Sequence, residues 1–204
     1  MVNQNIALVD EQSDEERFGP LRDPQGKPRE WETGVKPKSL TILTKEMGEK
    51  LRSYRELAQS SLFWNVAQCS SFLWAMSDGG DVMIAYEEIV VDLDIADHPE
   101  LKEGYPRRRG YPTHPATEKK LGHPTLVGGG KARIAGELFL DVKDEKLHWF
   151  VNCNSGRYCR EISVRPTQAN CAAVEALFRE LIETDVRFDD PLMDDPSESE
   201  GGRQ

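Results

Sequence analysis

Three residues of the types used in acid–base chemistry lie in one segment of the chain: His123, Glu137 and Tyr158. An imidazole exchanges a proton near neutral pH, a carboxyl group can act as an acid or base, and a phenol can donate a hydrogen bond. We name these three as candidate catalytic residues, with His123 as the general base or as a group that orients a ligand. The alternative is structural, because the same side chains could bond to the backbone and pack over a hairpin.

Four further residues of this segment are candidates for ligand binding: Thr125, Gly129, Ser155 and Arg157. Glycines allow a ligand to approach the backbone closely, and an arginine can hold a phosphate or a carboxylate through two hydrogen bonds. The structural alternative stays open here too. Ser155 could simply form a turn, and Arg157 could pair with Glu137 across two strands.

The sequence predicts no metal site. Cys69, Cys153, Cys159 and Cys171 contain no C-x-x-C spacing, so a zinc ribbon is not indicated. In a reducing compartment we expect thiols, partly buried. A metal held by Cys153, Cys159 and His148 is a less favoured alternative, and a Cys153–Cys159 disulfide requires export from the cell. The cofactor, if there is one, is unknown.

Two charged clusters precede this segment. Glu87 and Glu88 lie near Asp92 and Asp94, a grouping that suits either a metal or a solvated strand face. The run 107–109 consists of three arginines, in a proline-containing stretch, 97–122, that we expect to form a loop. Such a run could hold a phosphate or an acidic partner, or could be solvated.

The elements that must position these residues follow from apolar spacing. Residues 44–60 and 61–76 carry apolar residues at helical intervals, with Thr44 as the N-cap of the first helix and 78–80 ending the second. Residues 82–95 predict one or two strands. Residues 132–142 and 147–151 predict a hairpin, followed by a helix from Pro166 and a closing strand at 185–188. The predicted fold class is α+β: an N-terminal helix pair plus a small antiparallel sheet with a packed C-terminal helix.

The chain divides into three parts by composition. Residues 1–38 are rich in charge, proline and glycine, which predicts a polar, flexible arm that Trp31 attaches to the body. Residues 39–188 form a single α+β domain, of which 121–188 carries the candidate site. Residues 189–204 predict an acidic, disordered tail, which serves solubility or, on a sharper hypothesis, mimics a substrate or docks on a basic partner.

The candidate site also carries a resemblance. Its motif residues, in chain order, are His123, Leu126, Gly128-Gly129, Ala135-Gly136-Glu137-Leu138 and Asn154-Ser155-Gly156-Arg157-Tyr158. This order resembles the C-terminal regions of bacterial polymorphic (Rhs-type) toxins and the C-terminal half of the plant IQ-motif calmodulin-binding protein family. The resemblance covers about 121–188. The chain departs from the pattern in four ways: Pro124-Thr125 replace a Ser-Ser pair, Arg157 replaces a histidine, Pro166 is further from Tyr158, and no IQ motif is present.

Charge narrows the function classes. Acidic residues outnumber basic ones by 36 to 26, a net charge of −10, which argues against a sequence-independent nucleic-acid binder. No apolar run is long enough for a membrane span, and no basic stretch resembles a secretory signal. We therefore expect a cytoplasmic protein, or one delivered by a signal-less export route.

We carry two functions forward from the sequence. The resemblance implies a soluble toxin-system, effector-like protein with a ligand or catalytic site within 121–160, acting on a small molecule, a nucleotide or a protein. The alternative is a non-catalytic binding module, such as an immunity protein or an adaptor, with a protein partner. A purely structural role for the module is the third hypothesis.

Overall fold

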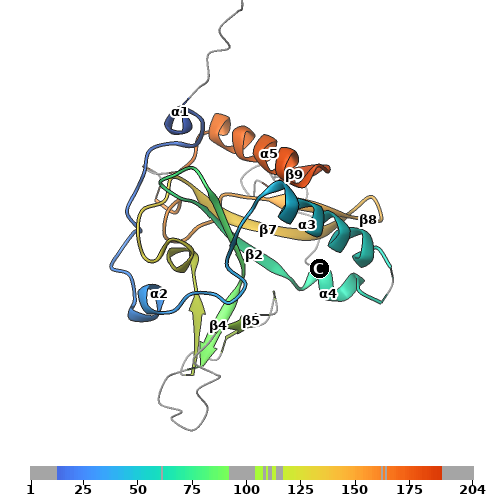
Figure 1. Cartoon of the computed structure of the whole chain (residues 1–204), viewed down its shortest axis with the longest axis horizontal. Helices are drawn as coiled ribbons and strands as arrows, with labels where there is room; N and C mark the ends of the chain where they lie inside the picture. Colours follow the sequence, from blue (N-terminus) through green and yellow to red (C-terminus); the bar gives the residue numbers. More distant parts are fainter. Residues whose placement is uncertain are drawn as a thin grey trace, which may run out of the picture.

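The computed structural model describes residues 13–60, 62–91, 104–107, 109, 112–113, 117–161, 163 and 165–189. Its centre is a six-stranded sheet in the order β1–β3–β2–β7–β8–β9 (Figure 1). The strands are β1 (Thr41–Ile42), β2 (Ser71–Met76), β3 (Val82–Tyr86), β7 (Ala135–Lys143), β8 (Lys146–Val151) and β9 (Val186–Phe188). Neighbouring strands are antiparallel, except that β8 and β9 are parallel. The predicted α+β class is confirmed, but the sheet is mixed and larger than the small antiparallel sheet we expected.

Two long helices, α3 (Lys45–Ala58) and α5 (Gln168–Ile182), lie side by side over one face of this sheet (Figure 1). Both begin where the sequence predicts, with Thr44 and Thr167 accepting hydrogen bonds from backbone N–H groups of the first turn. The helices cross closely at Gly48, where an added Cβ atom would stand 1.8 Å from the backbone oxygen of Leu181. The core beneath them includes fully buried Trp74, whose ring meets that of Phe178 at 5.1 Å, edge to face.

The hairpin formed by β7 and β8 is the longest pairing in the sheet, and it follows the prediction. Its two turn residues, Asp144 and Glu145, both have positive φ, at 52° and 60°. A two-residue turn with positive φ at both positions matches the right-handed twist of the flanking strands. The hairpin therefore fixes the register that aligns Leu138 with Val151 near the candidate site.

The predicted helix over 61–76 is wrong for most of its length. Within the described residues, only α4 (Trp64–Gln68) is helical, and 71–76 form β2, a central strand. Every residue of β2 is buried, so both of its faces are apolar and no alternation appears in the sequence. Its apolar residues match a helical spacing by coincidence. The glycines at 79 and 80 belong to the β2–β3 turn and do not end a helix.

The segment we expected to be a flexible arm lies along the body from residue 13 onward. It contains two short helices, α1 (Asp14–Phe18) and α2 (Glu30–Gly34). Phe18 is buried in the core, Arg22 forms a β-bridge with Ala132, and the indole N–H of Trp31 donates to the backbone oxygen of Lys120 at 3.2 Å. The expected attachment through Trp31 is therefore present, and Phe18 is an attachment that the composition did not reveal.

A second, three-stranded sheet has the order β5–β4–β6 and lies below the main one in Figure 1. Its strands are β4 (Glu88–Val91), β5 (Tyr105–Pro106) and β6 (Glu118–Leu121). Two of these strands fall in the stretch 97–122 that we expected to be a loop. Asp92 and Asp94 lie outside the described residues, as do 1–12 and 190–204. Among the described helices, none combines the length and the apolar character that a membrane crossing requires.

Candidate functional site

His123 begins a short 3₁₀ helix, η2 (His123–Val127), and points inward. Only 6 % of its surface is exposed, and its Nε2 lies 2.9 Å from the backbone oxygen of Gly136. Because a carbonyl oxygen can only accept, Nε2 carries the proton. Burial lowers the pKa of His123 to about 4, against a smaller opposing effect of the Gly136 carbonyl. The ring is thus neutral at pH 7, and this nitrogen cannot act as a base while the bond persists.

Tyr158 is also turned into the body. Its hydroxyl donates to the backbone oxygen of Gly130 at 2.6 Å, and only 1 % of the residue is exposed. Burial raises the pKa of this phenol well above its ordinary value. Ser155, three residues earlier, accepts hydrogen bonds from the backbone N–H groups of Arg157 and Tyr158 at 3.3 and 3.2 Å. These side chains hold the 155–159 turn in shape and connect it to the loop that contains Gly130.

Arg157 is bound to the N-terminal segment. Its Nη2 lies 2.7 Å from a carboxylate oxygen of Glu32 and donates to the backbone oxygen of Lys27 at 3.0 Å. Glu32 is buried and also accepts from the backbone N–H of Arg29 at 2.7 Å, at the start of α2. The Nη2 group of Arg157 is therefore directed at this chain's own carboxylate and carbonyl, while its Nε is buried without a hydrogen-bond partner among the described residues. Arg157 does not pair with Glu137.

The two candidates of the η2 loop are placed by packing. Thr125 is buried, and its hydroxyl donates to the backbone oxygen of Gly122 at 2.8 Å. Gly129 has a φ of +78°, and a Cβ atom there would stand 2.6 Å from the side chain of Thr33 in α2. Glycine is needed at 129 for the left-handed conformation and for the approach of α2.

Glu137 lies in a different environment from the other candidates. It sits in β7, and burial raises the pKa of its carboxyl group, with Glu87 adding to the effect. Arg109, Lys120 and the side chain of Asn152 act in the opposite direction. Glu137 is therefore the candidate catalytic residue whose surroundings favour the acid form of a carboxyl group.

The structure therefore brings six of the seven candidates into one bonded unit. The η2 loop supplies His123, Thr125 and Gly129, the 155–159 turn supplies Ser155, Arg157 and Tyr158, and the Tyr158–Gly130 bond joins the two. This unit is a scaffold held by hydrogen bonds to the backbone, which engage the Nε2 of His123 and the hydroxyl groups of Thr125, Ser155 and Tyr158.

Sequence reasoning missed two residues that complete the unit. Asn152 is 2 % exposed, and its side-chain oxygen accepts from the backbone N–H groups of Glu137 and Asn154, both at 3.0 Å. Glu32 is the partner of Arg157 from a segment we expected to be flexible. The position of Asn152 directly after a predicted strand is a signal that could have identified it, because asparagine often bonds to the backbone at such turns. For Glu32 there is no local signal, because 125 positions of sequence separate it from Arg157.

The charged clusters of the sequence also have structural partners. Glu88 is buried and accepts from the backbone N–H groups of Lys38 and Ser39, both at 2.9 Å. Glu87 pairs with Arg107 at 2.5 Å and with Lys120 at 3.6 Å. The guanidinium of Arg109 stacks on Phe139, 3.8 Å from its ring centre. Arg108 lies outside the described residues. Within the described part, no group of three or more His, Cys, Asp or Glu side chains is arranged to hold a metal.

A groove of about 940 Å³ runs beside the 155–159 turn. We call it the α5 groove. Its walls come from the ends of β7, β8 and β9, from residues 153–160, and from the first half of α5. Its apolar lining includes Phe150, Phe188 and Pro166, and Cys153, Cys159 and Cys171 also belong to the lining. Burial raises the pKa of the Cys159 thiol to about 11, so this thiol stays protonated and unreactive at neutral pH.

The charges of the α5 groove differ from those of the rest of the chain. Lys143, Arg160 and Arg165 line it, and none of the three forms an ion pair with a carboxylate of the described residues. Of the two acidic residues in the lining, Glu175 is paired with Arg179 at 2.6 Å, and Asp189 is the last residue of the described chain. In a chain of net charge −10, the described residues of this groove thus include three cations that no described carboxylate pairs with.

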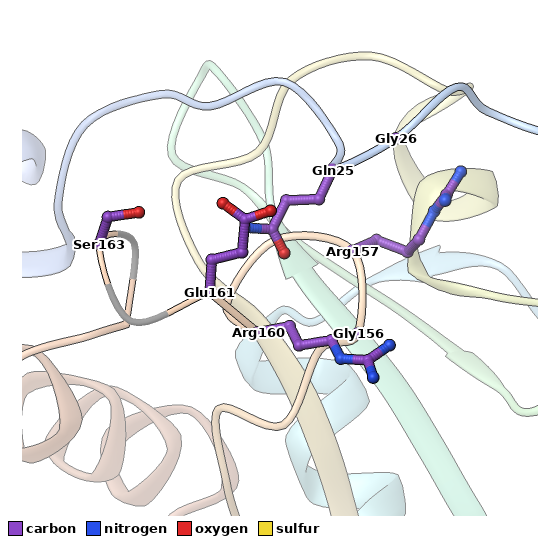
Figure 2. Close-up of a pocket in the computed structure, with 7 residues that line it drawn as sticks. All are labelled: Gln25, Gly26, Gly156, Arg157, Arg160, Glu161 and Ser163. Carbon is purple, nitrogen blue, oxygen red and sulfur yellow. The ribbon is translucent and has the colours of Figure 1, made fainter.

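A second, more open hollow of about 870 Å³ adjoins the groove and shares Gly156 and Arg160 with it. Figure 2 shows Gln25 and Glu161 lying together there, while the guanidinium of Arg157 points away from them toward its own partners. Among the described residues of this lining, the charged groups do not converge on one point, and the α5 groove is the better candidate for ligand binding. Comparisons of the chain with models of known families, with curated proteins and with solved structures found no match.

Proposed function

We propose that this protein is a non-catalytic binding module that takes an acidic, partly apolar segment of a partner protein into the α5 groove. The observation that carries the proposal is the set of three cations, Lys143, Arg160 and Arg165, that line this groove without ion-pair partners among the described residues. Positive charge left unpaired beside a concave surface attracts a negatively charged partner.

The chemistry of the groove favours a peptide segment over a small anion. The three cations come from separate places: the end of β7, the loop after Tyr158 and the residue before Pro166. Phe150 and Phe188 belong to the same lining, and their rings suit apolar side chains of a bound segment. The first turn of α5 contains no acidic residue, so the positive end of its helix dipole adds to the same field.

The state of the candidate catalytic residues supports binding over catalysis. The Nε2 of His123 and the hydroxyl of Tyr158 are each bonded to a backbone carbonyl inside the body. A general base must reach the proton that it abstracts, and neither group is directed at the α5 groove or at solvent. Of the two functions that the sequence raised, the binding module of the immunity or adaptor kind is the one that this geometry supports.

The direct test is binding of a labelled probe to the full chain. The probe is a synthetic peptide of alternating aspartate and leucine residues, with its affinity measured by fluorescence anisotropy at two salt concentrations. We expect the Arg160→Glu/Arg165→Glu variant to lose at least tenfold in affinity, and added salt to weaken wild-type binding. The matched control, Lys36→Glu/Lys50→Glu, makes the same charge change on exposed residues elsewhere. Equal loss in both variants would mean that net charge alone, and not the groove, attracts the probe.

One observation favours a second function, an effector-type enzyme. Glu137 has a carboxyl pKa raised by burial, a property of many general acids. The test is bacterial growth after tightly controlled induction of the wild-type protein and of Glu137→Gln. Toxicity that disappears in a soluble, folded Glu137→Gln protein would favour the enzyme. Growth unaffected by either protein agrees with the binding module.

A further inference from the structure

The described chain ends inside the α5 groove. The backbone N–H of Asp189 donates to the backbone oxygen of Val151 at 2.8 Å, which continues the pairing of β9 with β8. Asp189 is also part of the groove lining. Residues 190–204 follow Asp189 directly in the sequence.

The composition of 190–204 complements the groove. This segment holds five acidic residues against one arginine, a net charge of −4. Its apolar pair, Leu192-Met193, lies between prolines at 191 and 196 and is followed directly by Asp194-Asp195. Acidic side chains next to an apolar pair are the counterpart of a groove that is lined by three cations together with Phe150 and Phe188.

We infer that residues 190–195 bind in the α5 groove of the same molecule and compete there with the partner's acidic segment. The inference rests on the proposed function, because it assigns the regulation of the same groove. An extended chain spans about 3.3–3.6 Å per residue, so six residues cover roughly 20 Å, enough to follow a groove of this size. A short tether gives an effective concentration in the millimolar range, so even a weak contact is occupied most of the time.

Competition of this kind lowers the affinity of the α5 groove for a partner's segment but does not abolish binding. If the tail segment binds with a dissociation constant of about 0.1 mM and its effective concentration is about 1 mM, the affinity for an outside peptide falls roughly tenfold. Loss of the tail's charge then raises that affinity by a similar factor.

The first test measures this competition. A labelled peptide with the sequence of residues 190–204 is titrated into the full chain and into its Asp194→Asn/Asp195→Asn variant. We expect the variant to bind the peptide about tenfold more tightly, because its own tail no longer competes. The matched control, Asp10→Asn/Glu11→Gln, removes two charges from the other acidic terminus and should bind like the wild type.

The outcomes separate the two proposals. Equal affinity in the wild type and the Asp194→Asn/Asp195→Asn variant, with binding still lost in Arg160→Glu/Arg165→Glu, overturns the tail inference and leaves the groove function standing. Absence of binding in all of the proteins overturns the groove function.

The second test places the tail directly. A carbodiimide joins a carboxylate to a lysine amine with no spacer, and Lys143 is the lysine of the groove lining. We expect mass spectrometry of the dilute full chain to find residues 190–200 joined mainly to Lys143, with this product absent in Lys143→Arg. Products spread equally over exposed lysines such as Lys36 and Lys50 would overturn the inference.

Discussion

At the scale of single residues, the unit around His123 illustrates how a pattern typical of catalysis can serve the fold. A histidine, a tyrosine and a serine stand out in the sequence because their side chains can exchange protons and bind ligands. In the structure the histidine is bonded to the backbone of strand β7, the tyrosine to the backbone of the loop that follows η2, and the serine to the backbone of its own turn. Their measurable contribution should therefore be to stability.

The first prediction concerns pH. The pKa of His123 in the folded protein, about 4, lies below the value of 6.5 for a free histidine, so the unfolded state binds a proton first as the pH falls. His123 therefore contributes stability above pH 6.5 that is lost as the pH falls through 6.5 toward 4. Relative to His123→Gln, the wild-type free energy of unfolding should fall by about 1.4 kcal/mol per pH unit in that window. Urea unfolding at several pH values gives this difference. A difference that stays constant with pH would contradict the buried, neutral imidazole.

The second prediction concerns Tyr158→Phe. Removal of the hydroxyl leaves the carbonyl of Gly130 without its donor, which should lower the free energy of unfolding by about 1–2 kcal/mol. Binding of the acidic probe to the α5 groove should change less than twofold, because the hydroxyl points away from it. The two quantities are measured by urea unfolding and by fluorescence anisotropy. A tyrosine that acts on a ligand would show the reverse pattern.

At the scale of elements, the sequence predicted those whose apolar pattern has one clear period. The helix α3, the β7–β8 hairpin, α5 and β9 were predicted close to their observed bounds. The strand β2 was not, because burial on both faces removes the alternation that identifies a strand. The same reasoning applies to the site. Its residues were found from their types, but their hydrogen-bond partners depend on long-range packing that no local pattern encodes.

The crossing of α3 and α5 gives a prediction that runs against helix propensity. Alanine is a better helix former than glycine, yet a Cβ atom at Gly48 would stand 1.8 Å from the backbone of α5. Gly48→Ala should therefore destabilise the protein by about 2 kcal/mol or more, since one helix must shift. Gly34→Ala is the control, because no atom lies within 4 Å of the added group, and its stability should be unchanged or slightly higher. Thermal unfolding of both variants compares the two positions.

At the scale of the whole molecule, one buried ion pair joins the N-terminal segment to the body. Glu32 is 4 % exposed, and in Arg157→Met its carboxylate would remain buried without the guanidinium. We expect a loss of about 3 kcal/mol in the free energy of unfolding, together with faster proteolysis within 13–38. Glu32→Gln/Arg157→Met should recover part of the loss, because the unpaired charge is gone. No recovery in the double variant would mean that the packing of Arg157, and not its charge, holds the segment.

The packing of α1 on α5 also sets an order of events during synthesis. The side-chain amide of Asn170 donates to the backbone oxygen of Arg17 at 2.9 Å, across 153 positions of sequence. As a ribosome releases the chain from its N-terminus, Phe18 and its neighbours emerge long before the helix that covers them. Until α5 leaves the exit tunnel, α1 and its Phe18 stay exposed to solvent, and a chaperone can bind them. The native fold of this protein is thus completed only after almost all of its described residues have been made.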